Sequence, residues 1–181
     1  MSKETLKNIY FIIIGIAITE ALNRTFEGAQ DFLMVALSLI IFLPTIIRFT
    51  HGASLYLDKT YKRRKKIAIN FISFSIQSLL FYIMSIFIEN IIVFQILLFC
   101  MLINDAIWML ILIFKDYEEF DNEFKQWLIS DGFFCFAIII SFILIWVNFN
   151  YIGLIVVLIY STFATFWDYI KNKDTYFPQK N

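Results

Sequence analysis

Histidine, cysteine, glycine and proline are scarce in this chain of 181 residues, which contains one, two, five and two of them respectively. A zinc site needs three or four ligands held close together, and one histidine with two separate cysteines does not supply them. Both cysteines, Cys100 and Cys135, lie inside apolar runs, where cysteine usually behaves as a small buried hydrophobic residue. We therefore expect no metal site, no disulfide framework and no cofactor.

An excess of charge of one sign is also missing, because 15 basic and 15 acidic residues cancel. Without net positive charge the chain has no general attraction to nucleic acid, and we expect no direct nucleic-acid partner. The sequence contains neither a Gly-Xaa-Ser-Xaa-Gly nucleophile motif nor a phosphate-binding loop. These absences predict a protein that is not an enzyme.

Apolar residues, by contrast, make up 60% of the chain, and the mean hydropathy is +0.74. A soluble domain is usually about 45–50% apolar, so the excess predicts helices that face lipid. A spanning helix needs about 20 residues. We expect an all-α, polytopic transmembrane helix bundle that forms a single domain over residues 1–181. Six spans, arranged as three hairpins, are predicted at 9–26, 32–50, 67–88, 91–114, 132–147 and 151–170.

The polar segment 115–131, between the fourth and fifth spans, has apolar residues at helical intervals. Phe124, Trp127 and Leu128 follow Tyr117 and Phe120 in this pattern. Such spacing predicts a short amphipathic helix that lies at the membrane surface or extends the fourth span. We expect this helix on the cytoplasmic side.

Basic residues are concentrated on one side of the predicted membrane, and the other side has only Arg24 near its surface. The positive-inside rule makes the basic side cytoplasmic, which places both termini there. Ile, Phe, Lys and Asn, which have A+T-rich codons, are abundant, and this composition is typical of a bacterial genome. We therefore expect an integral protein of the bacterial inner (plasma) membrane.

Several charged residues are predicted to lie within or beside the membrane. Glu20 and Arg24 share a helix face and can pair, either in the bundle interior or at the outer interface. By helical rise, Arg48 lies ~25 Å and Asp105 ~21 Å from the outer surface, so these two could also pair. A position at the headgroup boundary is the simpler explanation for Arg48 and Asp168. Asp105 is therefore the strongest single candidate for a functional residue.

Uncharged polar residues add to this set. His51, the only histidine, could act as a pH-sensitive switch or, more simply, as a structural hydrogen-bonding group at a helix end. Small serines in the third span would let another helix approach closely. The serine stripe of that span consists of the three serines Ser75, Ser78 and Ser85, together with Tyr82, which continues their spacing. The predicted intramembrane residues, which would line a pore or a helix interface, are Glu20, Arg24, Arg48, His51, Gln77, Asn104, Asp105 and Asp168.

Two charged loops of opposite sign are predicted to face the cytoplasm. The basic loop can orient the protein and attract anionic headgroups, or it can dock a protein, and the two roles are compatible. The acidic loop lacks the glycine-spaced ligands of a calcium-binding loop. The predicted docking residues are Lys59, Lys62, Arg63, Arg64, Lys65 and Lys66 in the basic loop and Glu118, Glu119, Asp121 and Glu123 in the acidic loop.

The sequence thus favours a non-enzymatic, multi-pass membrane protein that acts as an oligomeric sensor or anchor for a cytoplasmic partner. A component of bacterial stress response or antiviral (phage) defence is one setting in which such a protein would work. The alternative is an ion channel or small-solute transporter with an acidic intramembrane site. In both cases we expect a homo-oligomer in contact with anionic lipid headgroups.

Overall fold

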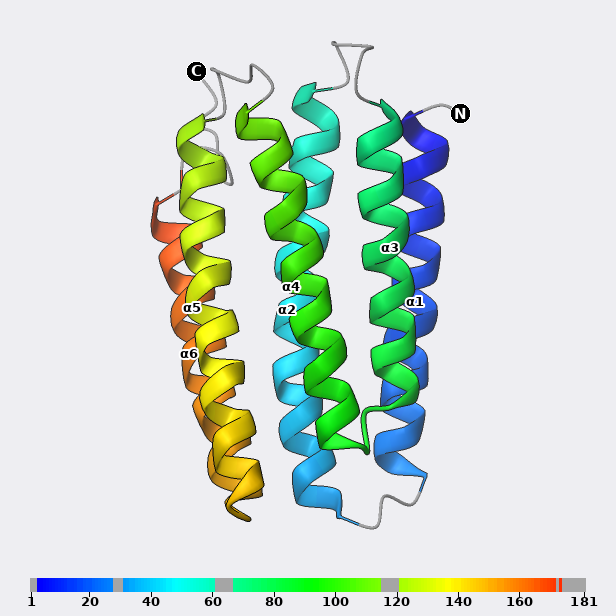
Figure 1. Cartoon of the computed structure of the whole chain (residues 1–181). Helices are drawn as coiled ribbons and strands as arrows, with labels where there is room; N and C mark the ends of the chain where they lie inside the picture. Colours follow the sequence, from blue (N-terminus) through cyan, green and yellow to red (C-terminus); the bar gives the residue numbers. More distant parts are fainter. Residues whose placement is uncertain (1–2, 28–30, 61–66, 115–120, 172, 174–181) are drawn as a thin grey trace. The chain divides into compact units, whose positions relative to one another are not determined.

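The computed structural model describes the backbone of residues 3–27, 31–60, 67–114, 121–171 and 173, and the side chains of 4–27, 31–54, 69–114, 124–171 and 173. Six helices form in this part of the chain (Figure 1), and each is long and apolar enough to cross a membrane. The predicted all-α, multi-pass membrane architecture is confirmed at this level. The helices are α1 (Lys3–Phe26), α2 (Phe32–Thr60), α3 (Ile67–Ile86), α4 (Ile91–Phe114), α5 (Asp121–Trp146) and α6 (Asn150–Lys171).

The predicted short amphipathic helix is not present as a separate element among the described residues. Helix α5 begins at Asp121 instead of residue 132, so the segment from Phe124 onward forms its first turns. Phe124, Trp127 and Phe134 are all buried, at 0%, 9% and 1% exposure. These residues recur at helical intervals, so they lie on one face that runs from the polar segment before residue 132 into the apolar segment after it. A continuous buried face of this kind favours one unbroken helix.

Short polar turns define several helix ends. Asp31 caps α2, because its carboxylate accepts a hydrogen bond from the Met34 backbone amide at 3.1 Å. Asn90 caps α4 in the same way: its side-chain oxygen accepts from the Val93 backbone amide at 3.1 Å. Asn148, between α5 and α6, has a φ of 66°, a left-handed conformation that asparagine tolerates better than most residues. These residues start and stop helices without needing long loops.

The chain forms two compact units, Met1–Asn104 and Asp105–Asn181, which we call the N-terminal and C-terminal units. In the N-terminal unit, α1 packs against α2 and α3. Phe42 of α2 makes edge contacts with Phe81 of α3 and Phe94 of α4, at centroid distances of 6.1 Å and 6.3 Å. Such aromatic pairs join three helices through dispersion and quadrupole interactions.

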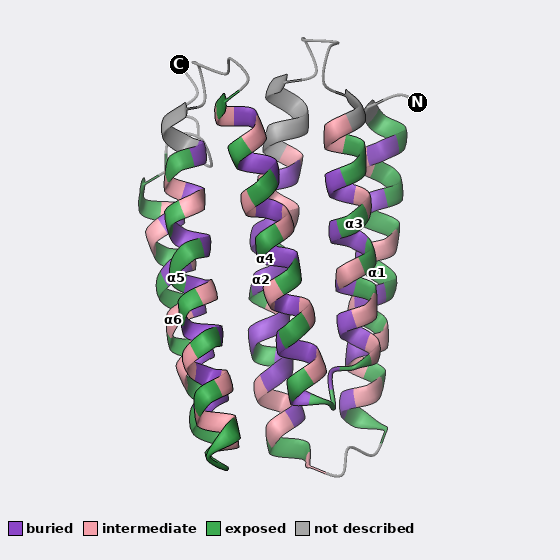
Figure 2. Cartoon of the chain, in the orientation of Figure 1, coloured by how far each residue is buried: buried purple, intermediate pink, exposed green. Residues whose placement is uncertain are grey.

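Buried and exposed residues alternate around each helix at helical intervals (Figure 2). The exposed positions include large apolar side chains such as Ile12, Ile47 and Phe166, at 63%, 61% and 64% exposure. Continuous apolar surface of this kind is rare on soluble proteins but is what the hydrocarbon of a bilayer requires.

In the C-terminal unit, α5 and α6 make the most intimate helix contact. A Cβ added at Gly153 would lie 2.8 Å from the Ser141 hydroxyl and 3.2 Å from the Ser141 carbonyl oxygen. Small residues allow such close approach of two backbones in a membrane. The buried face of α6 consists of Gly153, Leu154, Val157, Ser161, Ala164 and Asp168.

Replacing Gly153 by leucine should therefore separate α5 from α6. We expect Gly153→Leu to lower the free energy of unfolding by about 1–3 kcal/mol, the usual cost of overpacking. Equilibrium unfolding in mixed detergent micelles measures this change. Gly132→Leu is the matched control, because a Cβ at Gly132 meets nothing within 4 Å. Equal stability of the two variants would contradict the close contact.

Candidate functional site

A buried hydrogen bond links α1 to α3 within the membrane-crossing part of the N-terminal unit. The Tyr10 hydroxyl donates to the Gln77 side-chain oxygen at 2.9 Å, and the two residues are 3% and 1% exposed. The Tyr10 ring also meets the edge of Phe74, with centroids 5.8 Å apart. Gln77, predicted from its position near mid-membrane, thus has a specific partner on another helix.

A second polar contact joins α3 to α4. The Asn104 amide donates to the Ser73 hydroxyl at 3.2 Å and to the Ser73 carbonyl oxygen at 3.3 Å. Because Gln77 and Ser73 both belong to α3, this helix is hydrogen-bonded to α1 and to α4. Hydrogen bonds between membrane helices contribute about 0.6 kcal/mol each on average, but they also select which helices become neighbours.

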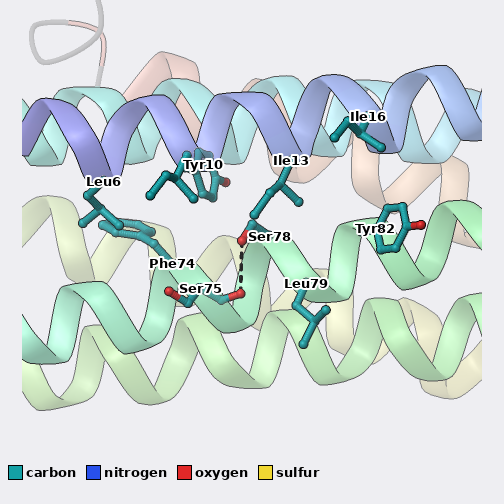
Figure 3. Close-up of a pocket in the computed structure, with 10 residues that line it drawn as sticks. Leu6, Tyr10, Ile13, Ile16, Phe74, Ser75, Ser78, Leu79 and Tyr82 are labelled. Carbon is teal, nitrogen blue, oxygen red and sulfur yellow. Dashed lines mark hydrogen bonds between the residues drawn. The ribbon is translucent and has the colours of Figure 1, made fainter.

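A groove of about 430 Å³ lies between α1 and α3 (Figure 3). Tyr10, which bonds to Gln77, is one of the residues that line it. Ser75, Ser78 and Tyr82 of the serine stripe line it together with isoleucines of α1. The Ser78 hydroxyl donates to the Ser75 carbonyl oxygen at 3.0 Å, as the dashed line in Figure 3 shows. Because this hydroxyl is satisfied within its own helix, the groove is suited to an apolar occupant.

A second groove, of about 460 Å³, lies between α1 and α2 and includes His51. Its lining combines Phe11, Gly15 and Ile18 of α1 with Thr50, His51 and Ser54 of α2. His51 therefore borders a space that a ligand could occupy, and the hydroxyl-bearing residues Thr50 and Ser54 line the same groove.

Glu20 and Arg24 form the predicted pair within α1. The Arg24 Nε atom lies 2.6 Å from the Glu20 carboxylate, and the side chains are 33% (Glu20) and 40% (Arg24) exposed. They line a polar pocket of about 290 Å³ with Glu27 and Glu89, and Glu89 belongs to the turn that follows α3. This partial exposure at the helix ends favours the interface position over the bundle interior.

Arg48 of α2 is buried, at 5% exposure. Its guanidinium carbon lies 5.3 Å from the centroid of the neighbouring Phe49 ring, a cation–π distance. Arg48 belongs to the N-terminal unit and Asp105 to the C-terminal unit. The predicted pair of these two residues stays a prediction.

Three aspartates of the C-terminal unit are buried among the residues whose side chains the structure describes. Asp105, Asp131 and Asp168 are 8%, 1% and 1% exposed, and each lies in a helix that can cross the membrane. Asp105 and Asp168 were predicted as site residues, whereas Asp131 was not, because residues up to 131 were predicted to form a polar segment between two spans. The spacing Phe124, Trp127, Asp131, Phe134 would have placed Asp131 on the buried face of α5.

Gln95 of α4 was also not selected as a site residue. It is 0% exposed, and neither atom of its amide has a hydrogen-bond partner among the described residues. A buried, unpaired amide in hydrocarbon costs several kcal/mol, about 2–7 by transfer measurements. Its position on the same face as Leu98 and Leu102 is the signal that it points inward.

The side chains of the predicted docking residues are not among those that the structure describes. They are Lys59, Lys62, Arg63, Arg64, Lys65, Lys66, Glu118, Glu119, Asp121 and Glu123. Within the described part of the chain, no group of three or more His, Cys, Asp or Glu residues is placed to hold a metal ion.

The Tyr10–Gln77 contact can be tested by a double-mutant cycle. Tyr10→Phe and Gln77→Met should each destabilise the protein, and the double variant should lose less than their sum, with a coupling of about 0.6–1.7 kcal/mol. Unfolding in mixed detergent micelles gives the four free energies. Thr19→Val paired with Gln77→Met is the control, since the Thr19 hydroxyl bonds only to the Gly15 carbonyl oxygen, at 3.0 Å. Additive effects at Tyr10 and Gln77 would show that the bond does not stabilise the fold.

Comparison of the chain with protein-family models, with curated proteins and with solved structures found no match in any of the three.

Proposed function

We propose that this protein is a non-enzymatic membrane sensor or anchor that works as a homo-oligomer with a cytoplasmic protein. The observation that supports it is the position of α3. This helix borders the α1–α3 groove, and it bonds to α1 through Gln77 and to α4 through Ser73. A hydrophobic molecule that enters the groove would change how α1 packs against α3.

Helix α3 also provides a route from the membrane to the cytoplasm. It begins at Ile67, directly after residues Lys62–Lys66 of the basic loop, which we call the basic run. A shift of about 1–2 Å in a packed helix is a common way to transmit a signal. In this proposal the basic run is the output: it docks a cytoplasmic protein whose surface is acidic, and it releases or binds that protein as α3 moves.

The proposal is tested with a photo-reactive amino acid in place of Tyr61, next to the basic run. Irradiation of intact cells should cross-link a cytoplasmic protein. Changing Lys62, Arg63, Arg64, Lys65 and Lys66 to glutamine should reduce the yield about tenfold or more, because docking depends on these charges.

The control changes Lys171 and Lys173, at the other end of the chain, to glutamine and should leave the yield unchanged. Tags on both termini verify that each variant keeps its orientation in the membrane. Cross-links to lipid alone, or an equal yield in the neutralised variant, would rule out docking at this segment.

A second function, a cation or proton pathway, is supported by the three buried aspartates. A charge within the bilayer is costly and usually marks an ion path or a proton relay. Asp105, Asp131 and Asp168 are each at most 8% exposed. Their carboxylates could replace part of the hydration shell of a cation during passage.

Flux into liposomes tests this second function. The purified protein should catalyse cation or proton uptake, and Asp105→Asn, Asp131→Asn or Asp168→Asn should reduce the initial rate about tenfold or more, since each removes a buried charge. Glu4→Gln, at an exposed position of α1, should have no effect. Absence of flux in the unaltered protein would leave the sensor or anchor as the better explanation.

A further inference from the structure

The α1–α2 groove has a polar end and an apolar end. Helices α1 and α2 are consecutive, are packed together and run in opposite directions, so Phe11 of α1 lies at the same end as Ser54 of α2. Thr50 and His51 are at that end as well. From Phe11 to Ile18 the α1 side of the groove extends for ~10 Å, calculated from the helical rise. A molecule with a polar head and an apolar chain would match this arrangement.

The Thr50 hydroxyl differs from the hydroxyls of Thr25 and Thr45. Thr25 and Thr45 each donate to the carbonyl oxygen four residues earlier, both at 2.7 Å. The Thr50 hydroxyl is buried and makes no hydrogen bond to any described residue, although Thr50 lines the groove. A threonine in a helix has two χ1 rotamers open to it, so this hydroxyl can change position while the helix stays intact. A buried hydroxyl without a partner is costly, and a ligand oxygen would relieve that cost.

A cation lies beside the polar end of the groove. The Lys7 ammonium is 5.9 Å from the centroid of the Phe11 ring, which lines the groove. A lysine near a membrane surface attracts anionic headgroups with about 1 kcal/mol. Lys7, the hydroxyls of Thr50 and Ser54, and the imidazole of His51 together form a set suited to a phosphate.

Gly15 keeps the middle of the groove open. A Cβ added there would meet nothing within 4 Å, so the glycine leaves space next to Ile18 and Ile47. The groove volume of about 460 Å³ is within the usual range for sites that bind small molecules. This space can take an apolar chain without any change in helix packing.

We propose that the α1–α2 groove binds one anionic phospholipid. Its phosphate lies at Thr50, His51 and Ser54 beside Lys7, and one acyl chain runs past Gly15 toward Ile18. The site is separate from the α1–α3 groove and from the basic run, and it does not depend on the proposed sensor function. A lipid bound here would hold α1 against α2.

Native mass spectrometry of the detergent-purified, full-length protein tests the site with two added lipids of equal chain length. Phosphatidylglycerol should be retained about fivefold more than phosphatidylcholine, the preference expected for one favourable lysine contact. Gly15→Leu, which fills the groove, should abolish this retention. Thr50→Val, which keeps the shape but removes the hydroxyl, should weaken it severalfold. Lys7→Gln should make the two lipids equal.

Gly132→Leu is the matched control, since Gly132 is an exposed glycine of α5 where a Cβ also meets nothing within 4 Å. It should retain phosphatidylglycerol as the unaltered protein does. A phosphatidylglycerol with a photo-reactive group in its acyl chain should cross-link to peptides that contain Gly15 or Ile47, and this result does not depend on how the variants fold.

Three results would overturn the proposal. They are equal retention of the two lipids by the unaltered protein, full retention of phosphatidylglycerol by Gly15→Leu, and cross-links spread evenly over all six helices. The last result would mean that lipids contact the protein only as a general solvent. Docking of a cytoplasmic protein at the basic run is measured separately, so either proposal can fail without the other.

Discussion

The structure depends on one constraint: hydrocarbon offers no hydrogen-bond partners, so a polar group inside it is costly unless it finds a partner within the protein. Several threonine hydroxyls meet this requirement locally. The hydroxyls of Thr25, Thr45 and Thr165 donate to the carbonyl oxygen four residues earlier, at 2.7 Å, 2.7 Å and 2.8 Å. A short polar side chain that is bonded in this way needs no partner on a neighbouring helix.

Longer polar side chains have a different consequence. The Gln77 and Asn104 amides bond across to another helix, to Tyr10 and Ser73 respectively. An arrangement of α1, α3 and α4 that breaks these bonds leaves the amides without these partners, whereas apolar side chains impose no such directional requirement. Hydrogen bonds thus specify the neighbours, and rings such as Phe42 and Phe81 supply the contact area between them.

The sequence predicted the elements well where an apolar run had clear limits. Helix α4 spans Ile91–Phe114 as expected, because Asn90 and Lys115 interrupt the run at both ends. Helix α5 was predicted to begin too late, since the acidic residues around Asp121 outweighed the helical spacing that continues through Trp127. Asp131 was missed for the same reason. The partner of Gln77 was not predictable, because local sequence does not tell which helix faces a given side chain.

The contact of Gly153 with Ser141 has a consequence for how the protein is made. Helices α5 and α6 are joined only by the residues around Asn148, and their backbones touch directly. Such a pair can leave the ribosome and enter the bilayer as one hairpin, because its contact needs no other helix. Gly153 lies on the buried face of α6, so a hairpin that inserts as one unit turns this face inward from the start.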